Sequence, residues 1–213
     1  YFQRFNNLLL VIVSLSMLAP LIHLVAVSFS SNKYVGAKLV YFWPRDFNIE
    51  VYKTIFATDS LWRALGVSIY ITVFGTFIAL LFTSTMAFAL SRPNMPYRKL
   101  LLKGIIVTFV FSVPLIPSYL LVRSLYLDNT LWALMIPGAL SAFNVIIMKT
   151  FFQGISAELF DAAKIDGCNE WRIFGRVAIP MSSPVIATIA LFHAVGQWNS
   201  YFSALIYIRT KTM

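Results

Sequence analysis

The chain has 213 residues, of which 59% are hydrophobic and only 12% are charged, and its mean hydropathy is +0.78. Soluble proteins carry roughly 25% charged residues, so this composition excludes an ordinary soluble domain and indicates a membrane protein. The net charge of +9 is explained by Lys and Arg beside membrane segments, because no basic cluster is dense enough to bind nucleic-acid phosphates. The lone Cys168 excludes an intrachain disulfide framework.

Five stretches contain no charged residue and are long enough to cross a bilayer, which takes about 20 residues of helix. They are residues 5–32, 64–91, 104–122, 129–148 and 177–208. All five are predicted to be helices, since a spanning segment must satisfy its own backbone hydrogen bonds. The last stretch is longer than one span needs, so part of it is expected to be tilted or interfacial. The predicted fold class is therefore an all-α, polytopic transmembrane protein.

The connecting segments predict the orientation of the chain. Residues 92–103 contain Arg92, Arg98, Lys99 and Lys103 but no acid, which places them in the cytoplasm together with the N-terminus and residues 149–176. Residues 33–63 are rich in aromatic side chains and are expected to form a folded loop on the outer side. The total of Lys and Arg is nearly even between the two sides, so the prediction depends on the 92–103 segment.

Residues 155–184, here called the charged insert, hold half of the acidic residues in a mostly apolar chain. We expect one helix capped by Ser156, a turn at Asp166-Gly167, and a second helix over about residues 169–177. Pro180 and Pro184 then limit where the next helix begins. A solvated loop and a docking element for another protein both fit this pattern.

The sequence of the charged insert resembles that of a known family. Asp161-Ala162-Ala163, then Asp166-Gly167, Phe174, Arg176 and the run Ile-Pro-Met-Ser-Ser-Pro at 179–184 resemble the "EAA loop" of binding-protein-dependent ABC importer permeases. The fuller sequence is similar to the sugar-uptake branch, the MalG-like and LplC/YtcP-like permeases, with supporting runs at 131–144, 151–153 and 195–202. The sequence departs from the family at Asp161, where Glu is usual, and at Ser156, where Pro is common.

The resemblance implies one MetI/MalG-like permease domain over residues 1–213 in the bacterial inner membrane, with a sixth span beyond the C-terminal end of this sequence. It implies a second homologous permease, two ATP-binding subunits and an extracytoplasmic solute-binding protein as partners. The cargo would be an oligosaccharide or a polysaccharide fragment, moved by alternating access. The coupling loop at about 155–180 would dock the ATPase through the following residues: Glu158, Asp161, Ala162, Ala163, Asp166, Gly167, Phe174 and Pro180.

No pattern in the sequence predicts an enzyme. There is no Gly-x4-Gly-Lys-Ser/Thr loop for phosphate, no cluster with metal-ligand spacing and no Ser-His-acid arrangement. We therefore expect no catalytic residue, no metal site and no cofactor on this chain, with ATP and Mg on the partner subunits.

Polar residues inside membrane spans are costly and often functional. A substrate path is predicted along Asn144, His193, Gln197 and Tyr201, because the last three recur every four residues on one helical face, with Ser200 on the same side. Hydrogen bonds between helices are the alternative explanation for the lone histidines, His23 and His193. Several Gly and Pro within spans are expected to mark packing kinks, or broken helices at a transport path: Gly75, Pro114, Pro117, Pro137 and Gly138.

Three other functions remain as alternatives. An ABC importer for a non-sugar solute such as an anion would favour basic residues within spans, and there are none. An ion-coupled secondary transporter predicts carboxylates within spans, but all eight acids lie outside them. A membrane-embedded enzyme would need a set of catalytic residues, and the sequence shows no such pattern.

Overall fold

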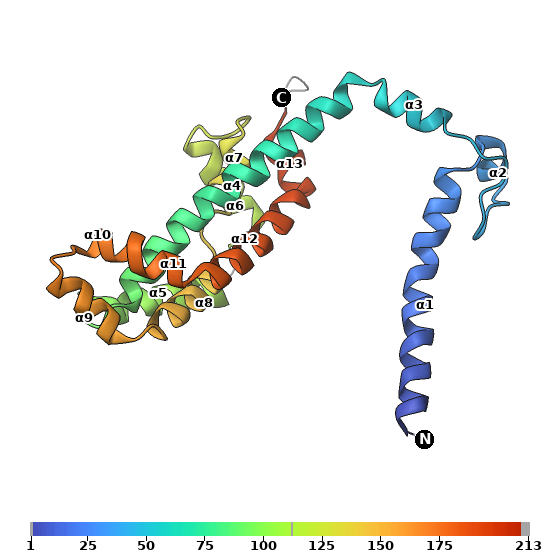
Figure 1. The fold of residues 1–213 in the computed structure, drawn as a ribbon. Helices are drawn as coiled ribbons and strands as arrows, with labels where there is room; N and C mark the ends of the chain where they lie inside the picture. The colour runs from blue at the N-terminus through green and yellow to red at the C-terminus, as the bar shows by residue number, and fades with distance from the viewer. Residues whose placement is uncertain (1, 112, 210–213) are drawn as a thin grey trace. The chain divides into compact units, whose positions relative to one another are not determined.

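In the computed structural model, the structure describes residues 2–111 and 113–209. The chain divides into two compact units, Tyr1–Ala64 and Leu65–Met213, with the boundary inside helix α4 (Figure 1). Within the described ranges, the pairing of extended backbone is limited to an isolated bridge between Ser30 and Phe47. The prediction of an all-α fold is confirmed.

The first unit begins with a helix of spanning length, α1 (Phe2–Ser28). It continues through Pro20, and its side chains are almost all exposed and mostly apolar. An apolar, exposed helix of 27 residues is suited to a bilayer, where lipid covers its surface. This helix confirms the first predicted span.

The rest of the first unit folds onto the end of α1. Two short helices follow, α2 (Asn32–Gly36) and α3 (Glu50–Phe56). The rings of Phe29 and Phe47 stack with centroids 5.4 Å apart, and the hydroxyl of Ser30 donates to a backbone carbonyl of α1. His23 Nδ1 lies 2.7 Å from the carbonyl oxygen of Tyr41. The aromatic 33–63 segment is therefore folded, as predicted.

Helix α4 (Asp59–Ser91) is the second helix of spanning length and runs the length of the second unit (Figure 1). Its buried positions recur at helical spacing along one stripe, and many of them are small: Ile71, Gly75, Thr76, Ala79, Thr83, Ser84, Ala87, Phe88 and Leu90. Small side chains let helix backbones approach closely in a membrane, where packing contacts replace the hydrophobic effect. This stripe is the surface on which the other helices of the unit assemble.

The other three predicted spans are broken, so the prediction of one continuous helix in each was wrong. Residues 104–122 divide between α5 (Arg98–Val110) and α6 (Leu115–Ser124), and residues 129–148 between α7 (Trp132–Met135) and α8 (Ala142–Gln153). Pro114 takes an extended conformation at the N-cap of α6, and Pro137-Gly138 lie between α7 and α8. The packing-kink interpretation therefore fails at these two places, whereas Gly75 lies inside the continuous α4.

The fifth stretch is also divided, into a bent helical pair and a short final helix. Residues Glu170–Met181 and Ser183–Trp198 (α12) are long and apolar enough together to cross a membrane, but they meet at an angle of 80°. Helix α13 (Tyr201–Tyr207) follows after Asn199 and Ser200. The hydropathy of the sequence marked the segments that avoid water, but it did not mark where their helices end.

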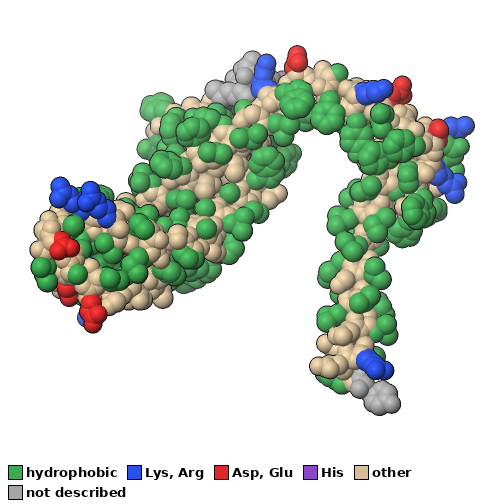
Figure 2. Space-filling view, in the orientation of Figure 1, with side chains coloured by type: hydrophobic (Ala, Val, Ile, Leu, Met, Phe, Trp, Pro, Cys, Tyr) green, Lys and Arg blue, Asp and Glu red, His purple; other side chains and the backbone are tan. Residues whose placement is uncertain are grey.

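Two clusters of buried apolar residues hold the second unit together, and α4 contributes to both. The larger one joins the C-terminal half of α4 to α5, α8, α12 and the charged insert, around Phe88, Met148 and Phe152. The smaller one joins Ile71 of α4 to α6, α7 and α13. In the space-filling view of this unit, Lys, Arg, Asp and Glu gather at the end formed by the charged insert, and hydrophobic side chains dominate along its length (Figure 2).

Candidate functional site

The charged insert forms the helical hairpin that the sequence predicted. Helix α9 (Ala157–Ile165) is followed by a turn in which Gly167 has φ +75°, the left-handed conformation that glycine adopts without strain. Helix α10 (Glu170–Ile173) begins after Asn169, whose side chain accepts a hydrogen bond from the backbone N–H of Arg172 at 2.9 Å. Ser156 occupies the N-cap position of α9, as predicted, but its side chain makes no capping hydrogen bond.

The second arm of the hairpin is longer than predicted. It continues from α10 through a π-helix, η1 (Phe174–Ala178), into α11 (Ile179–Met181), and then bends into α12 at Ser182. Pro180 is exposed in α11. Because every residue from Glu170 to Met181 is helical, the arm can transmit a displacement of the turn to α12.

The predicted ATPase-docking residues divide into an exposed and an inward-facing set. Exposed side chains on α9 and its turn are Glu158, Asp161, Ala162 and Asp166, and the apolar Ile165 between them is 87% exposed. Ala163 is buried against the chain's own core and therefore does not lie on the free surface with Ala162. Phe174 is half-buried, and its ring centroid lies 5.1 Å from that of Phe88 on α4, so it packs the second arm on this membrane helix.

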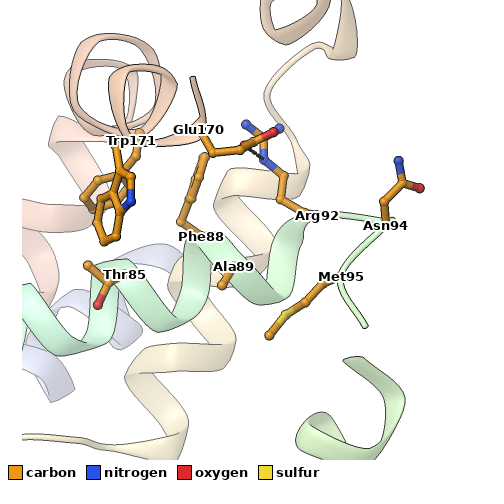
Figure 3. Close-up of a pocket in the computed structure, with 9 residues that line it drawn as sticks. Thr85, Phe88, Ala89, Arg92, Asn94, Met95, Glu170 and Trp171 are labelled. Atoms are coloured by element: carbon orange, nitrogen blue, oxygen red, sulfur yellow. Dashed lines mark ion pairs between the residues drawn. The ribbon is translucent and has the colours of Figure 1, made fainter. Parts of the chain in front are cut away.

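Arg92, the first residue after α4, joins this helix to both arms of the charged insert. Figure 3 shows it beside Phe88 and paired with Glu170 of the second arm. Its guanidinium carbon lies 4.4 Å from the ring centroid of Phe88 and 3.9 Å from that of Phe160 on α9. Its Nε lies 3.3 Å from a carboxylate oxygen of Glu170 on α10. We call Arg92, Phe88, Phe160 and Glu170 the Arg92 cluster. Each of its two cation–π contacts is worth about 0.5–2 kcal/mol, depending on how far water is excluded.

Burial distinguishes Arg92 from the other cation that contacts Glu170. The side chain of Arg92 is 17% exposed, whereas Lys164, whose Nζ lies 3.5 Å from the same carboxylate, is 50% exposed. Burial lowers the pKa of Arg92, and the carboxylates of Glu170 and Asp161 oppose this shift. Arginine starts from so high a pKa that the guanidinium stays charged, and the cluster carries a permanent cation.

A mostly apolar cavity of ≈ 360 Å³ opens beside the Arg92 cluster (Figure 3). Thr85 and Ala89 of α4 line it together with Trp171 and Phe174 of the second arm. In the close-up view the side chain of Trp171 extends toward Thr85. The second arm thus meets α4 through the cation of Arg92, the Phe88–Phe174 contact and the walls of this cavity.

A second site lies where the predicted substrate path was placed. An open cavity of ≈ 460 Å³ is lined by Gly138, Phe143, Asn144, Phe192, His193, Gly196 and Gln197, and we call it the polar cavity. The structure therefore brings together three of the four predicted path residues, Asn144, His193 and Gln197. Two aromatic rings and neutral polar groups without a charged side chain are suited to bind hydroxyl groups and sugar rings.

The two predicted path residues of α12 are held by groups outside this helix. Gln197 Nε2 donates to the carbonyl oxygen of Leu134 at 2.9 Å, and this carbonyl belongs to the last turn of α7, where it has no partner within the helix. His193 lies with Nε2 3.4 Å from the carbonyl of Gly138 and Nδ1 3.3 Å from the hydroxyl of Thr76 on α4. A carbonyl only accepts, so in the neutral imidazole Nε2 donates and Nδ1 accepts from Thr76.

The fourth predicted path residue, Tyr201, lies outside the polar cavity. Helix α12 ends at Trp198, and Tyr201 begins α13 after a non-helical Ser200, so the predicted face shared with His193 and Gln197 is interrupted. Tyr201 is 73% exposed. The four-residue spacing was valid only for a continuous helix, and the same break removes Ser200 from that face.

Sequence reasoning missed the partners that hold both sites. Phe88, Phe160 and the role of Arg92 were not predicted, and neither was the contact of Thr76 with His193. In the sequence, Arg92 is one of four basic residues in 92–103. It differs from the other three because it directly follows a long apolar helix. Phe88 lies one helical turn before it, but Phe160 and Glu170 lie about 70 residues further along the sequence, and no local pattern connects them to Arg92.

Comparison with known proteins agrees with this arrangement. Residues 79–211 match the family described as "Binding-protein-dependent transport system inner membrane component". Over 207 residues the chain is 45% identical to Protein LplC of Bacillus subtilis (strain 168), covering 97% of this chain and 70% of that protein. It is 42% identical over 199 residues to the polygalacturonan/rhamnogalacturonan transport system permease protein YtcP of the same organism, covering 93% and 70%.

A solved structure has the same fold over nearly the whole chain. It is a bacterial ABC transporter involved in the import of the acidic polysaccharide alginate, and a chain of it superposes with a TM-score of 0.94 at 34% identity. The superposition covers 99% of this chain and 75% of that one. The broken spans and the charged hairpin therefore belong to an architecture already seen in an ABC transporter.

Proposed function

The chain belongs to the family of binding-protein-dependent transport system inner membrane components, and from this premise we propose that it carries oligosaccharides or polysaccharide fragments across the membrane. As a member of this family it is a multi-pass, helical permease subunit of an ABC importer in the inner membrane, and not an enzyme. The near-whole-chain likeness to LplC, to YtcP and to the alginate importer supports a sugar polymer as the class of cargo.

The observation that carries the mechanism is the two-sided charged insert. Its inner side is fixed to α4 by Arg92, Phe160 and Phe174, while Asp161, Ala162 and Ile165 are exposed on its outer side. A rigid hairpin with a free, partly acidic face is suited to receive force from a soluble ATPase. We infer that two ATP-binding subunits, with ATP and its Mg²⁺ bound on them, drive the transport from this face.

The remaining partners and the substrate path complete the proposal. A second homologous permease forms the other wall of the path, and an extracytoplasmic solute-binding protein delivers the sugar. In this chain the polar cavity contributes Asn144, His193 and Gln197, which offer hydrogen bonds but no charge. If the cargo is acidic, this cavity recognises its hydroxyl groups and rings, and its carboxylates are bound elsewhere in the complex.

Reconstitution tests this function directly. The complex that co-purifies with this chain is placed in liposomes together with its binding protein, and uptake is measured for neutral oligosaccharides and for oligomers of uronic acids. We expect ATP-dependent uptake of at least one of these classes. Uptake that needs only an ion gradient, or ATP-dependent uptake of a non-sugar solute alone, would contradict the proposal.

A further inference from the structure

Helix α4 connects the charged insert with the polar cavity. Arg92, at its cytoplasmic end by the proposed orientation, contacts both arms of the insert, and Thr76 contacts His193 of the cavity. Sixteen residues of α-helix separate the two contacts, which is about 24 Å at 1.5 Å per residue. The helix is continuous between them, without proline, and its buried stripe packs against other helices throughout. A displacement of the Arg92 end is therefore transmitted along a continuous helix.

We propose that Arg92 is a positioning residue that fastens the charged insert to α4, so that movement imposed on the insert by the ATPase reaches the polar cavity through α4. This inference rests on the proposed function of the insert as the ATPase-docking element. Without the Arg92 link, motion of the insert would reach the other helices through the 80° bend at Ser182 and through apolar packing such as the Phe88–Phe174 contact, with no charged group joining both arms to α4. With it, α4 and α12 move together, and the two helices hold His193 between them.

The geometry of the cluster explains why the link needs arginine. The guanidinium carbon lies 4.4 Å from the ring centroid of Phe88 and 3.9 Å from that of Phe160, and Nε lies within ion-pair distance of Glu170, 3.3 Å from a carboxylate oxygen. One side chain thus contacts three helices, α4, α9 and α10. A lysine ammonium is a compact point charge and does not offer two faces and a directed edge at once. Lys164 illustrates the weaker case, since it is half-exposed and contacts Glu170 alone.

A purely stabilising role for Arg92 makes a different prediction from a coupling role. Loss of stability lowers the amount of assembled complex and reduces ATP hydrolysis and transport in proportion. Loss of coupling leaves the assembled complex and its basal ATP hydrolysis in place, while less sugar moves for each ATP hydrolysed. The ratio of sugar transported to ATP hydrolysed, measured on equal amounts of assembled complex, separates the two roles.

The first experiment compares Arg92→Ala and Arg92→Lys with Lys164→Ala, which removes the exposed contact to the same carboxylate. We expect Arg92→Ala to lower the sugar-to-ATP ratio about tenfold, within the range typical of free-energy coupling between linked sites. Arg92→Lys should recover part of this loss, and Lys164→Ala should stay within about twofold of the wild type, as expected for an exposed ion pair. An unchanged ratio in Arg92→Ala would overturn the inference.

The second experiment replaces the Arg92 link with a chemical one. Thr85 on α4 and Trp171 on the second arm line the same cavity (Figure 3), so both are changed to Cys in a Cys168→Ala, Arg92→Ala chain within the full complex. A bifunctional methanethiosulfonate reagent should restore the sugar-to-ATP ratio, and reduction should abolish it again. The single-Cys chains treated alike are the control. A confirmed cross-link that leaves the ratio low would contradict the fastening role.

Different results would contradict the proposed function and the proposed role of Arg92. If the wild-type complex shows no ATP-dependent uptake of any sugar, the proposed function is wrong. If the wild type transports sugar but Arg92→Ala transports it with the normal ratio, the function stands and the role of Arg92 is wrong. If Arg92→Ala does not assemble, the Arg92→Lys chain, with and without the cross-link, decides the outcome.

Discussion

The Arg92 cluster and the polar cavity lie along the same helix, yet different chemistry holds each of them together. At the Arg92 cluster, side chains contact side chains: a cation lies between two aromatic rings and beside a carboxylate. At the polar cavity, Gln197 and His193 bond to backbone carbonyls of residues 134 and 138, and among the residues that the structure describes the only side-chain partner of His193 is the hydroxyl of Thr76. Those carbonyls are available because the helix over 129–148 is broken, and the last carbonyls of a helix have no partner within it.

This difference shows how one membrane protein builds two kinds of site. A broken helix exposes backbone groups inside the membrane, and such groups are tolerated where they line a cavity or bond to protein. The result is a cavity lined by neutral hydrogen-bonding groups, which is consistent with the proposed sugar path. Charged side chains gather at the end formed by the charged insert, where Arg92 and Glu170 join segments that are distant in the sequence. Substitutions that disrupt one of the two regions and leave the other intact test whether their roles are separate.

The largest effect is expected from Gly167→Pro in the turn of the charged insert. Proline fixes φ near −65°, whereas Gly167 has φ +75° and its N–H donates to the carbonyl of Lys164. The turn must rearrange, and we expect sugar uptake to fall at least about tenfold, because proline is strongly disfavoured where its φ and missing N–H conflict with the native turn. Uptake and ATP hydrolysis by the reconstituted complex are the measurements.

Gly167→Asn is the matched control, since asparagine tolerates the left-handed conformation better than other non-glycine residues. It should keep most of the uptake. Equal losses in the proline and asparagine variants would show that the backbone conformation of the turn is not what matters there.

A smaller effect is expected at the polar cavity from Gln197→Leu. This change removes a hydrogen-bond donor of the cavity and leaves the carbonyl of Leu134 without its partner, which costs about 1–3 kcal/mol. Sugar uptake should fall several-fold while assembly and ATP binding persist. Tyr201→Leu is the comparison, because Tyr201 is exposed outside the cavity and should have little effect. Equal losses in the two variants would contradict the position of the path.

The smallest effect is expected from Asp161→Asn on the exposed side of α9. Exposed charges contribute little to affinity, so we expect binding of the ATPase subunits to weaken by only about twofold to fivefold. Asp161→Glu, which restores the family's usual residue, should bind at least as tightly as the wild type. Titration of purified ATPase subunits onto the permease in detergent measures both, and stronger binding by the asparagine variant would contradict the acidic contact.

Local signals predicted the hairpin well, and non-local contacts explain what was missed. The turn at Gly167 followed from residue type and spacing, because a short hairpin is largely determined by its own sequence. The continuity of the later spans did not follow, since hydropathy reports that Pro114 or Gly138 avoids water but not whether the helix runs through it. The exclusion of Tyr201 from the polar cavity and the burial of Ala163 are consequences of how the helices break and pack.

The Arg92 cluster shows the same limit at the level of single contacts. The sequence placed Arg92 in a basic loop, which is where the positive-inside rule expects it, and nothing nearby in the sequence indicated its partners. Phe160 and Glu170 come to it only after α9 and α10 fold back on the end of α4. Contacts between the end of α4 and a hairpin about 70 residues away depend on how the helices pack, and only the structure shows this packing.

We propose that an ATPase binds the exposed face of the charged insert, and photo-cross-linking measures this contact most directly. Ile165, which is 87% exposed, is replaced with p-benzoylphenylalanine in the assembled complex, and Tyr126, which is 89% exposed in the loop after α6, serves as the control. We expect a cross-link from position 165 to an ATP-binding subunit whose yield changes when ATP is added, and none from position 126. The absence of a cross-link at 165 in a complex that still transports sugar would contradict the account.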